Sequence, residues 1–141
     1  MPKRTEAELE TMIEQVMAIP LHRHLGLELV EREEGRARLR FRAGPAALTN
    51  VGSVHGGVLS LLLEPAALLA LLPMLDAGES AATVDVHVAF PAAPEPGHWI
   101  ELEGRVIRRA RQLAFCEAEA RSGGRLCAAA RLTKAVLTAR M

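Results

Sequence analysis

The chain has 141 residues, half of them hydrophobic but only 3% aromatic, and its 17 basic residues are balanced by 17 acidic ones. This predicts a single domain over residues 1–141 with an aliphatic core, preceded by an N-terminal helical extension over 1–20. The absence of a basic excess argues against nucleic-acid binding. The first ten residues are charged and do not read as a secretory signal, so we expect a cytoplasmic protein.

Residues 5–18 are predicted to form a helix. Thr5 can cap the first turn, and Glu8, three residues later, completes a capping box. Leu9 and Ile13 fall on one face of this helix, as expected for packing against a core. Pro20 is expected to end it.

Two strands are predicted at 25–31 and 35–42, joined by a tight turn at Glu33-Glu34-Gly35. The second strand alternates apolar residues with four arginines on one face: Arg36, Arg38, Arg40 and Arg42. Four arginines on one face could bind phosphate. A solvated or salt-bridged sheet face is the interpretation we favour.

An apolar run from Val58 to Leu75 follows a loop over 43–54 and predicts a buried central helix from about Gly56. The run is long enough to span a membrane. Its central carboxylate, Glu64, argues against a span, because such a group costs about 2.5–3.5 kcal/mol in mid-membrane.

Pro65 interrupts the hydrogen-bonding pattern of this helix. It has no amide to donate to the carbonyl of Leu61, so we expect the helix to kink or break beside Glu64.

Four further strands complete the predicted fold, at 81–90, 98–109, 112–121 and 125–137. One face of the first of these is expected to carry four apolar residues: Val84, Val86, Val88 and Phe90. Six strands and one long helix without βαβ alternation indicate an α+β fold with an antiparallel sheet.

The two cysteines are predicted to be free. If Gly123-Gly124 is a two-residue hairpin turn, Cys116 lies opposite Arg131 and roughly 13 Å from Cys127. A disulfide needs Cα atoms within about 7 Å. No cysteine and histidine spacing suggests zinc, and neither a metal nor a redox cofactor is expected.

The stretch Asn50-Val51-Gly52-Ser53-Val54-His55-Gly56-Gly57 leads into the apolar helix that contains the lone acid Glu64. Glycines let the backbone approach a ligand, and the first amides of a helix point outward unpaired with a partial positive charge. A carboxylate in apolar surroundings needs a partner or a task. Together these features indicate a site that polarises a carbonyl beside a carboxylate.

This motif, Asn-x-Gly-x-x-His-Gly-Gly with an acid nine residues after the histidine, resembles the PaaI-like (phenylacetate-pathway type) acyl-CoA thioesterases of the hotdog fold. Three downstream segments agree in order: Thr83 to Pro91, Arg108 to Phe115 and Ser122 to Ala128. The resemblance covers roughly residues 21–137. It implies a sheet wrapped around the central helix and hydrolysis of an aromatic or medium-chain acyl-CoA.

The resemblance also implies roles for individual residues. Glu64 would be the nucleophile or general base, and the Gly56 amide would stabilise the oxyanion. Asn50 would orient the thioester or water, and Thr83 would hold the attacking water. His55 could assist orientation or bind the loop, and the less favoured alternative is direct proton transfer.

Four further residues are expected near the substrate: Gly57 and Val54 around the histidine, and Arg109 and Arg111 at the coenzyme A phosphates. The two arginines would otherwise be exposed hairpin charges, Asn50 a turn residue and Thr83 an ordinary strand residue.

Two departures from the family pattern keep an alternative open. The spacing from Asn50 to His55 is one residue shorter than is common, and Pro65-Ala66-Ala67 stands where relatives often carry a threonine or serine. The alternative is a non-catalytic acyl-CoA-binding hotdog protein.

The active site is predicted to need two chains. Gly56 and Glu64 are eight residues apart, which places their backbones about 12 Å apart along a helix. A thioester carbonyl must lie within about 3 Å of both groups. A homodimer with antiparallel helices could pair Gly56 of one chain with Glu64 of the other, and two dimers could form a tetramer.

Overall fold

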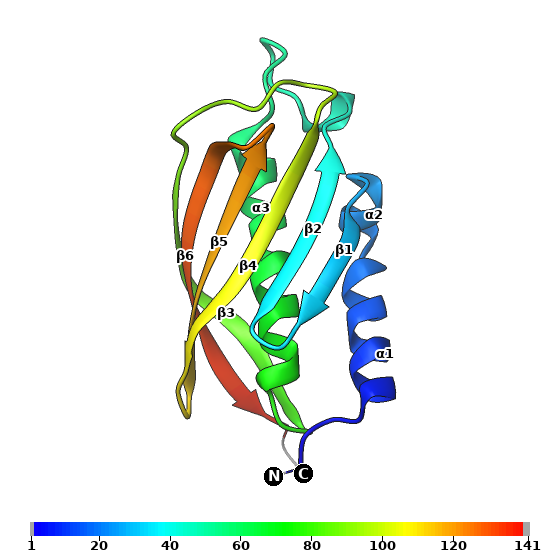
Figure 1. Cartoon of the computed structure of the whole chain (residues 1–141), viewed down its shortest axis with the longest axis vertical. Helices are drawn as coiled ribbons and strands as arrows, with labels where there is room; N and C mark the ends of the chain where they lie inside the picture. Colours follow the sequence, from blue (N-terminus) through cyan, green and yellow to red (C-terminus); the bar gives the residue numbers. More distant parts are fainter. Residues whose placement is uncertain (1, 140–141) are drawn as a thin grey trace.

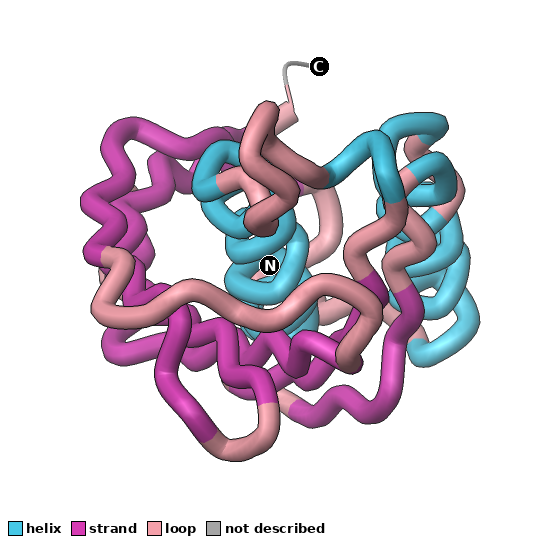
Figure 2. The backbone as a smooth tube through the Cα atoms, turned by 90° about the horizontal axis from the view of Figure 1, so that it is seen from above, coloured by secondary structure: helices cyan, strands magenta, loops and turns pink. Residues whose placement is uncertain are grey.

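The computed structural model describes residues 2–139, and its strands form a single antiparallel sheet around one long helix (Figure 1). In chain order the elements are α1 (Glu6–Met17), α2 (Pro20–His24), β1 (Glu28–Glu33), β2 (Arg36–Arg42), the 3-10 turn η1 (Pro45–Ala47), α3 (Gly56–Leu71), the 3-10 turn η2 (Leu72–Met74), β3 (Glu79–Ala89), β4 (Trp99–Arg109), β5 (Leu113–Ser122) and β6 (Arg125–Thr138). The six strands lie in the order β1-β2-β4-β5-β6-β3. Seen from above, the sheet curves around α3, and α1 lies beyond the β1 edge (Figure 2). This is the predicted α+β hotdog arrangement.

The N-terminal helix begins as predicted. The Thr5 side chain accepts from the Glu8 amide, and the Glu8 carboxylate accepts from the Thr5 amide, which completes the capping box. Leu9 and Ile13 are buried against the core. Pro20 does not only end a helix: it starts the short α2, and for this reason β1 begins later than predicted.

Helix α3 is the core of the domain. Its stretch Gly56–Met74 is apolar and long enough to cross a membrane by composition alone, but 56% of the apolar window is buried inside the domain. The helix lies directly on β4 at Gly104, where an added Cβ would come within 2.1 Å of the Ala66 carbonyl oxygen. Only glycine permits this approach of helix to sheet.

Pro65 lies inside α3 without interrupting it, because the helix is continuous from Gly56 to Leu71. The predicted break is therefore wrong. The predicted bend stays a prediction.

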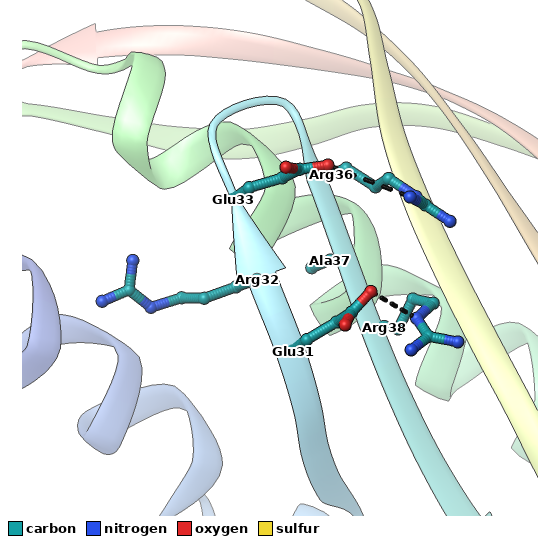
Figure 3. Close-up of a pocket in the computed structure, with 6 residues that line it drawn as sticks. All are labelled: Glu31, Arg32, Glu33, Arg36, Ala37 and Arg38. Atoms are coloured by element: carbon teal, nitrogen blue, oxygen red, sulfur yellow. Dashed lines mark hydrogen bonds and ion pairs between the residues drawn. The ribbon is translucent and has the colours of Figure 1, made fainter.

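The arginine face of β2 is a salt-bridged sheet face, as favoured. Arg38 pairs with Glu31 at 2.8 Å, and Arg36 pairs with Glu103 at 3.1 Å. A hollow of about 200 Å³ on the β1–β2 hairpin is lined by these neutralised charges, while Arg32 points away towards α1 (Figure 3). Because its arginines already hold carboxylates, this hollow is a poor candidate for a phosphate site.

The final hairpin turns at Gly123-Gly124 as predicted, but its register differs by one residue. A bulge at Cys127 shifts the pairing, so that Cys116 lies opposite Leu132 and not Arg131. The extra residue could not be read from the alternation of β5 and β6 alone. Both cysteines are free and buried, which confirms that they form no disulfide.

Candidate active site

Glu64 lies midway along α3, where its carboxylate meets side chains from two neighbouring strands. The Thr83 hydroxyl, on β3, donates to Glu64 Oε2 at 2.7 Å. Lys134 Nζ, on β6, donates to the same oxygen at 3.1 Å and to Thr83 Oγ1 at 3.0 Å. Thr83 and Lys134 are direct partners in the β3–β6 register, so the sheet presents both to the helix together.

A β-bulge explains why Thr83 faces α3. The register shifts between Thr83 and Asp85, which leaves Val84 as the extra residue of β3. Alternation predicted that Val84 shares a face with Val86 and Val88. Because of the bulge, it does not. The bulge instead turns Thr83 to the inner side, together with Val86, which pairs with the buried Leu132. Bulges commonly re-aim side chains in this way beside active sites.

Lys134 is the site residue that sequence reasoning missed. Its side chain is only 4% exposed, whereas that of Glu64 is 32% exposed. The sequence does contain a signal for this residue. On β6, Lys134 follows Ala130 and Leu132 at a spacing of two, which places it on the inward face, and Lys3 is the one other lysine of the chain. A cation at an inward strand position implies a buried anion.

The start of α3 forms a second polar region. His55 is the N-cap residue, and its Nδ1 accepts from the Gly57 amide at 2.8 Å. Within residues 2–139, no acceptor bonds the Gly56 amide, and the Phe90 ring would lie 3.3 Å from a Cβ placed on Gly56. The Gly56 amide is thus available to an oxyanion, whereas the Gly57 amide already serves the cap.

Among residues 2–139, none of the remaining predicted residues forms a hydrogen bond or ion pair with Glu64. Asn50 occupies an exposed turn, and Val54 is buried in the core, with 6% exposure. Arg111 lies on the exposed turn between β4 and β5, and its carbonyl accepts from Arg109. Arg109 is not a free surface charge: it is paired with Glu79 at 2.5 Å.

Cys116 adds no nucleophile to the site. Burial raises the pKa of its thiol, an effect that the nearby Lys134 partly offsets and that Glu64 reinforces. The thiol therefore stays protonated and unreactive at neutral pH. Among residues 2–139, no three histidine, cysteine or acidic side chains are grouped to hold a metal ion.

An apolar groove begins one helical turn beyond Glu64. It has a volume of about 240 Å³ and runs between α1, the end of α3 and the start of β3. The lining has no aromatic ring and, apart from Gln15, is aliphatic or small: Met12, Gln15, Val16, Ile19, Leu68, Leu72, Ser80 and Ala81. Neither Glu64 nor Thr83 lines the groove, but Leu68 follows Glu64 by four residues and Ala81 precedes Thr83 by two, so both lie on the same faces of α3 and β3 as the site.

Comparison with known proteins places the chain in a family. Residues 51–133 match the model of the thioesterase superfamily. A Pseudomonas aeruginosa protein whose name gives it an unproven esterase activity is 32% identical over 79 residues, which span 56% of this chain and 59% of that protein.

Three solved structures share the fold. A Haemophilus influenzae thioesterase superposes with a TM-score of 0.84 at 22% identity, covering 98% of this chain and 96% of the other. A mutant of the phenylacetic acid degradation protein PaaI from Thermus thermophilus gives 0.78 at 24% identity, covering 84% and 99%. A Streptococcus pneumoniae hypothetical thioesterase solved with coenzyme A gives 0.74 at 18% identity, covering 82% and 92%. The family model alone matches more than half of the chain, and the chain therefore belongs to the thioesterase superfamily.

Proposed function

We propose that the protein hydrolyses an acyl-CoA thioester to a free acid and coenzyme A, in the cytoplasm. The observation that carries this proposal is the carboxylate of Glu64, which is held by Thr83 and Lys134 and still one-third exposed. A positioned, accessible carboxylate can activate water or attack a carbonyl. The coenzyme A bound to the Streptococcus relative supports the choice of thiol.

The chemistry balances by either of two routes. As a general base, Glu64 takes a proton from water, the hydroxide adds to the thioester carbonyl, and the proton passes to the departing thiolate. As a nucleophile, Glu64 forms an anhydride with the acyl group and expels the thiolate, and water then cleaves the anhydride. In both routes the Gly56 amide stabilises the negative oxygen of the intermediate.

The groove favours an aliphatic over an aromatic acyl group. Apart from Gln15, its lining consists of aliphatic or small residues, and Leu68 and Ala81 of this lining lie near Glu64 and Thr83 along α3 and β3. A medium-length alkyl chain placed there would bury its methylenes at about 0.8 kcal/mol each.

The direct test is a panel of acyl-CoA substrates assayed by release of free thiol. We expect turnover that peaks at a medium chain length. Val16→Phe, which fills the groove, should move the peak to shorter chains, and Thr11→Phe on the exposed face of α1 is the matched control. If the enzyme prefers aromatic substrates and Val16→Phe does not change this preference, the acyl group does not bind in this groove.

The second candidate is a protein that binds acyl-CoA without cleaving it. The observation in its favour is Pro65-Ala66-Ala67, which provides no hydroxyl in the turn after Glu64. It predicts saturable binding of acyl-CoA without thiol release from any substrate in the panel.

We further propose that the active site is shared between two chains. Gly56 and Glu64 are eight residues apart on one continuous helix, which is about 12 Å of rise. β3 is an edge strand of the sheet, with Val84 and Val86 exposed by 60% and 43%. Unpaired apolar edges invite pairing with another chain, and β3 pairing across a twofold axis would bring the two helices together.

Mixing two inactive variants tests the shared site. Glu64→Gln removes the carboxylate, and Gly56→Val blocks the helix start against Phe90. Heterodimers of the two variants contain one intact site and should regain activity. If both variants fold, are inactive alone and form heterodimers that stay inactive, each chain must work by itself.

A further inference from the structure

Lys134 holds Glu64 from the buried side of the site. Its ammonium group has two partners, Glu64 Oε2 at 3.1 Å and Thr83 Oγ1 at 3.0 Å. The Lys134 side chain is 4% exposed, so substrate cannot reach it. This residue therefore acts through another group and does not touch the reacting atoms.

Both donors bind the same carboxylate oxygen. Thr83 and Lys134 each donate to Oε2, and among residues 2–139 no side chain or amide donates to Oε1 of Glu64. The Thr83 proton is committed to Glu64, which leaves this hydroxyl only as an acceptor for Lys134. The carboxylate is thus fixed through one oxygen, and the other remains available for chemistry.

Elementary electrostatics gives this arrangement a direction. A buried ammonium ion is costly without an anion, and Glu64 is the only carboxylate within salt-bridge distance of Lys134 in the part of the chain that the structure describes. Lys134 therefore has a single carboxylate to bind, and its position fixes that of Glu64 Oε2. Arg109, the other partly buried cation near this end of the sheet, is occupied by Glu79, and Cys116 beside the pair stays protonated.

We infer that Lys134 is a positioning residue for thioester hydrolysis, which holds Glu64 through Oε2 and leaves Oε1 free to act on the substrate. This inference rests on the proposed function. A carboxylate misplaced by about 1 Å can lose roughly 10²-fold in rate, so loss of Lys134 should lower kcat by about that factor, with a much smaller change in KM.

Lys134→Met is the principal variant, because it keeps an unbranched side chain that is one atom shorter and removes the charge. Lys3→Met is the matched control, since Lys3 makes an exposed pair with Glu34 and should leave kcat unchanged. Lys134→Gln retains a donor without charge and gives the same comparison if the methionine variant does not fold. Urea unfolding reports on the fold of each variant.

Two readouts separate positioning from mere stabilisation. In a Glu64→Gln background, Lys134→Met should cause little further loss of rate, because the two residues act as one unit. In Lys134→Ala, ethylammonium should restore part of kcat, whereas ethanol at the same concentration should not.

The outcomes decide between the hypotheses. A folded Lys134→Met or Lys134→Gln variant with unchanged kcat overturns the role of Lys134 alone, provided that the wild type hydrolyses acyl-CoA and Glu64→Gln does not. An equal loss in the wild-type and Glu64→Gln backgrounds overturns it as well. A wild type that releases no thiol from any substrate removes both this inference and the proposed function.

Discussion

Among residues 2–139, two ion pairs contain a side chain that is 9% exposed or less, and they differ in whether that side chain is the cation or the carboxylate. Glu79 is buried, with its side chain 9% exposed beside an Arg109 that is 16% exposed. In the other pair the cation Lys134 is sealed at 4%, and the carboxylate of Glu64 is 32% exposed. A sealed carboxylate can only hold the fold together, whereas an open carboxylate on a sealed cation can also react.

The surroundings of Glu79 fit this interpretation. Its Oε1 accepts from the Asp76 amide at 2.8 Å and from Arg109 at 2.5 Å, and Arg4 donates to its carbonyl. The cluster therefore ties the N-terminal segment, the start of β3 and the end of β4 together. The resemblance assigned Arg109 to coenzyme A phosphates, a role that would require it to leave this pair.

Substitution of Glu64, the exposed carboxylate of the two, should give the largest effect on activity. Glu64→Gln keeps the size and removes the charge, so thioester hydrolysis should fall by about 10²–10⁴-fold while binding of acyl-CoA persists. Thiol release and urea unfolding measured on the same preparation separate chemistry from stability. A variant that retains most of its kcat would remove Glu64 from the mechanism.

Much of the fold, and the position of Glu64, could be predicted from the sequence. The capping box at Thr5, the inward alternation of β2 and the apolar run of α3 are local patterns, and each one predicted its element. The acid at Glu64 was found because a charge in an apolar helix needs a reason.

The parts that escaped prediction depend on long-range pairing. Lys134 lies 70 residues from Glu64, and no local pattern connects them. The bulge at Val84, which turns Thr83 inward, is a feature of the pairing between β3 and β6, two strands that are far apart in the sequence. His55 was expected to assist orientation or bind the loop, and its bond to the Gly57 amide became visible only with the geometry of the helix start.

The next largest effect is expected at the contact that seats α3 on the sheet. In Gly104→Ala, the new methyl group would lie 2.1 Å from the Ala66 carbonyl oxygen, two residues after Glu64. A backbone atom cannot move aside as a side chain can, so we expect a loss of about 3 kcal/mol in unfolding free energy. Activity should fall as well, because the helix that carries Glu64 is displaced.

Gly44→Ala is the control for this substitution. Gly44 has open space around it and no positive φ angle, so both stability and activity should be unchanged. A Gly104→Ala variant as stable as Gly44→Ala would show that the helix is not seated on β4 as described.

Breaking the Glu79–Arg109 pair should lower stability without changing the rate of hydrolysis. Arg109→Met leaves the buried Glu79 carboxylate with only the Asp76 backbone amide as a donor among residues 2–139, which should cost about 1–3 kcal/mol of unfolding free energy. The kcat of the folded variant should match that of the wild type. Failure to bind coenzyme A with unchanged stability would instead support the phosphate-binding role of Arg109.

The smallest effect concerns the pH dependence of stability. Burial raises the pKa of Glu79, but the bonds from the Asp76 amide and Arg109 outweigh it and hold the pKa below the ordinary value of 4.5. A lowered pKa in the folded state favours the folded protein above the unfolded pKa, and this contribution is lost as the pH falls through the folded value. Glu79→Gln should therefore lower the unfolding free energy by about 0.5–1.5 kcal/mol at pH 7, and the difference from wild type should shrink below pH 4.5.

Glu34→Gln is the control. It alters the exposed pair with Lys3 and should show almost no difference in unfolding free energy at either pH. Urea unfolding at pH 7 and in the acid range measures both variants. A Glu79→Gln difference that stays constant across this range would mean that the carboxylate is not tied as the structure shows, and the contrast with Glu64 would then rest on exposure alone.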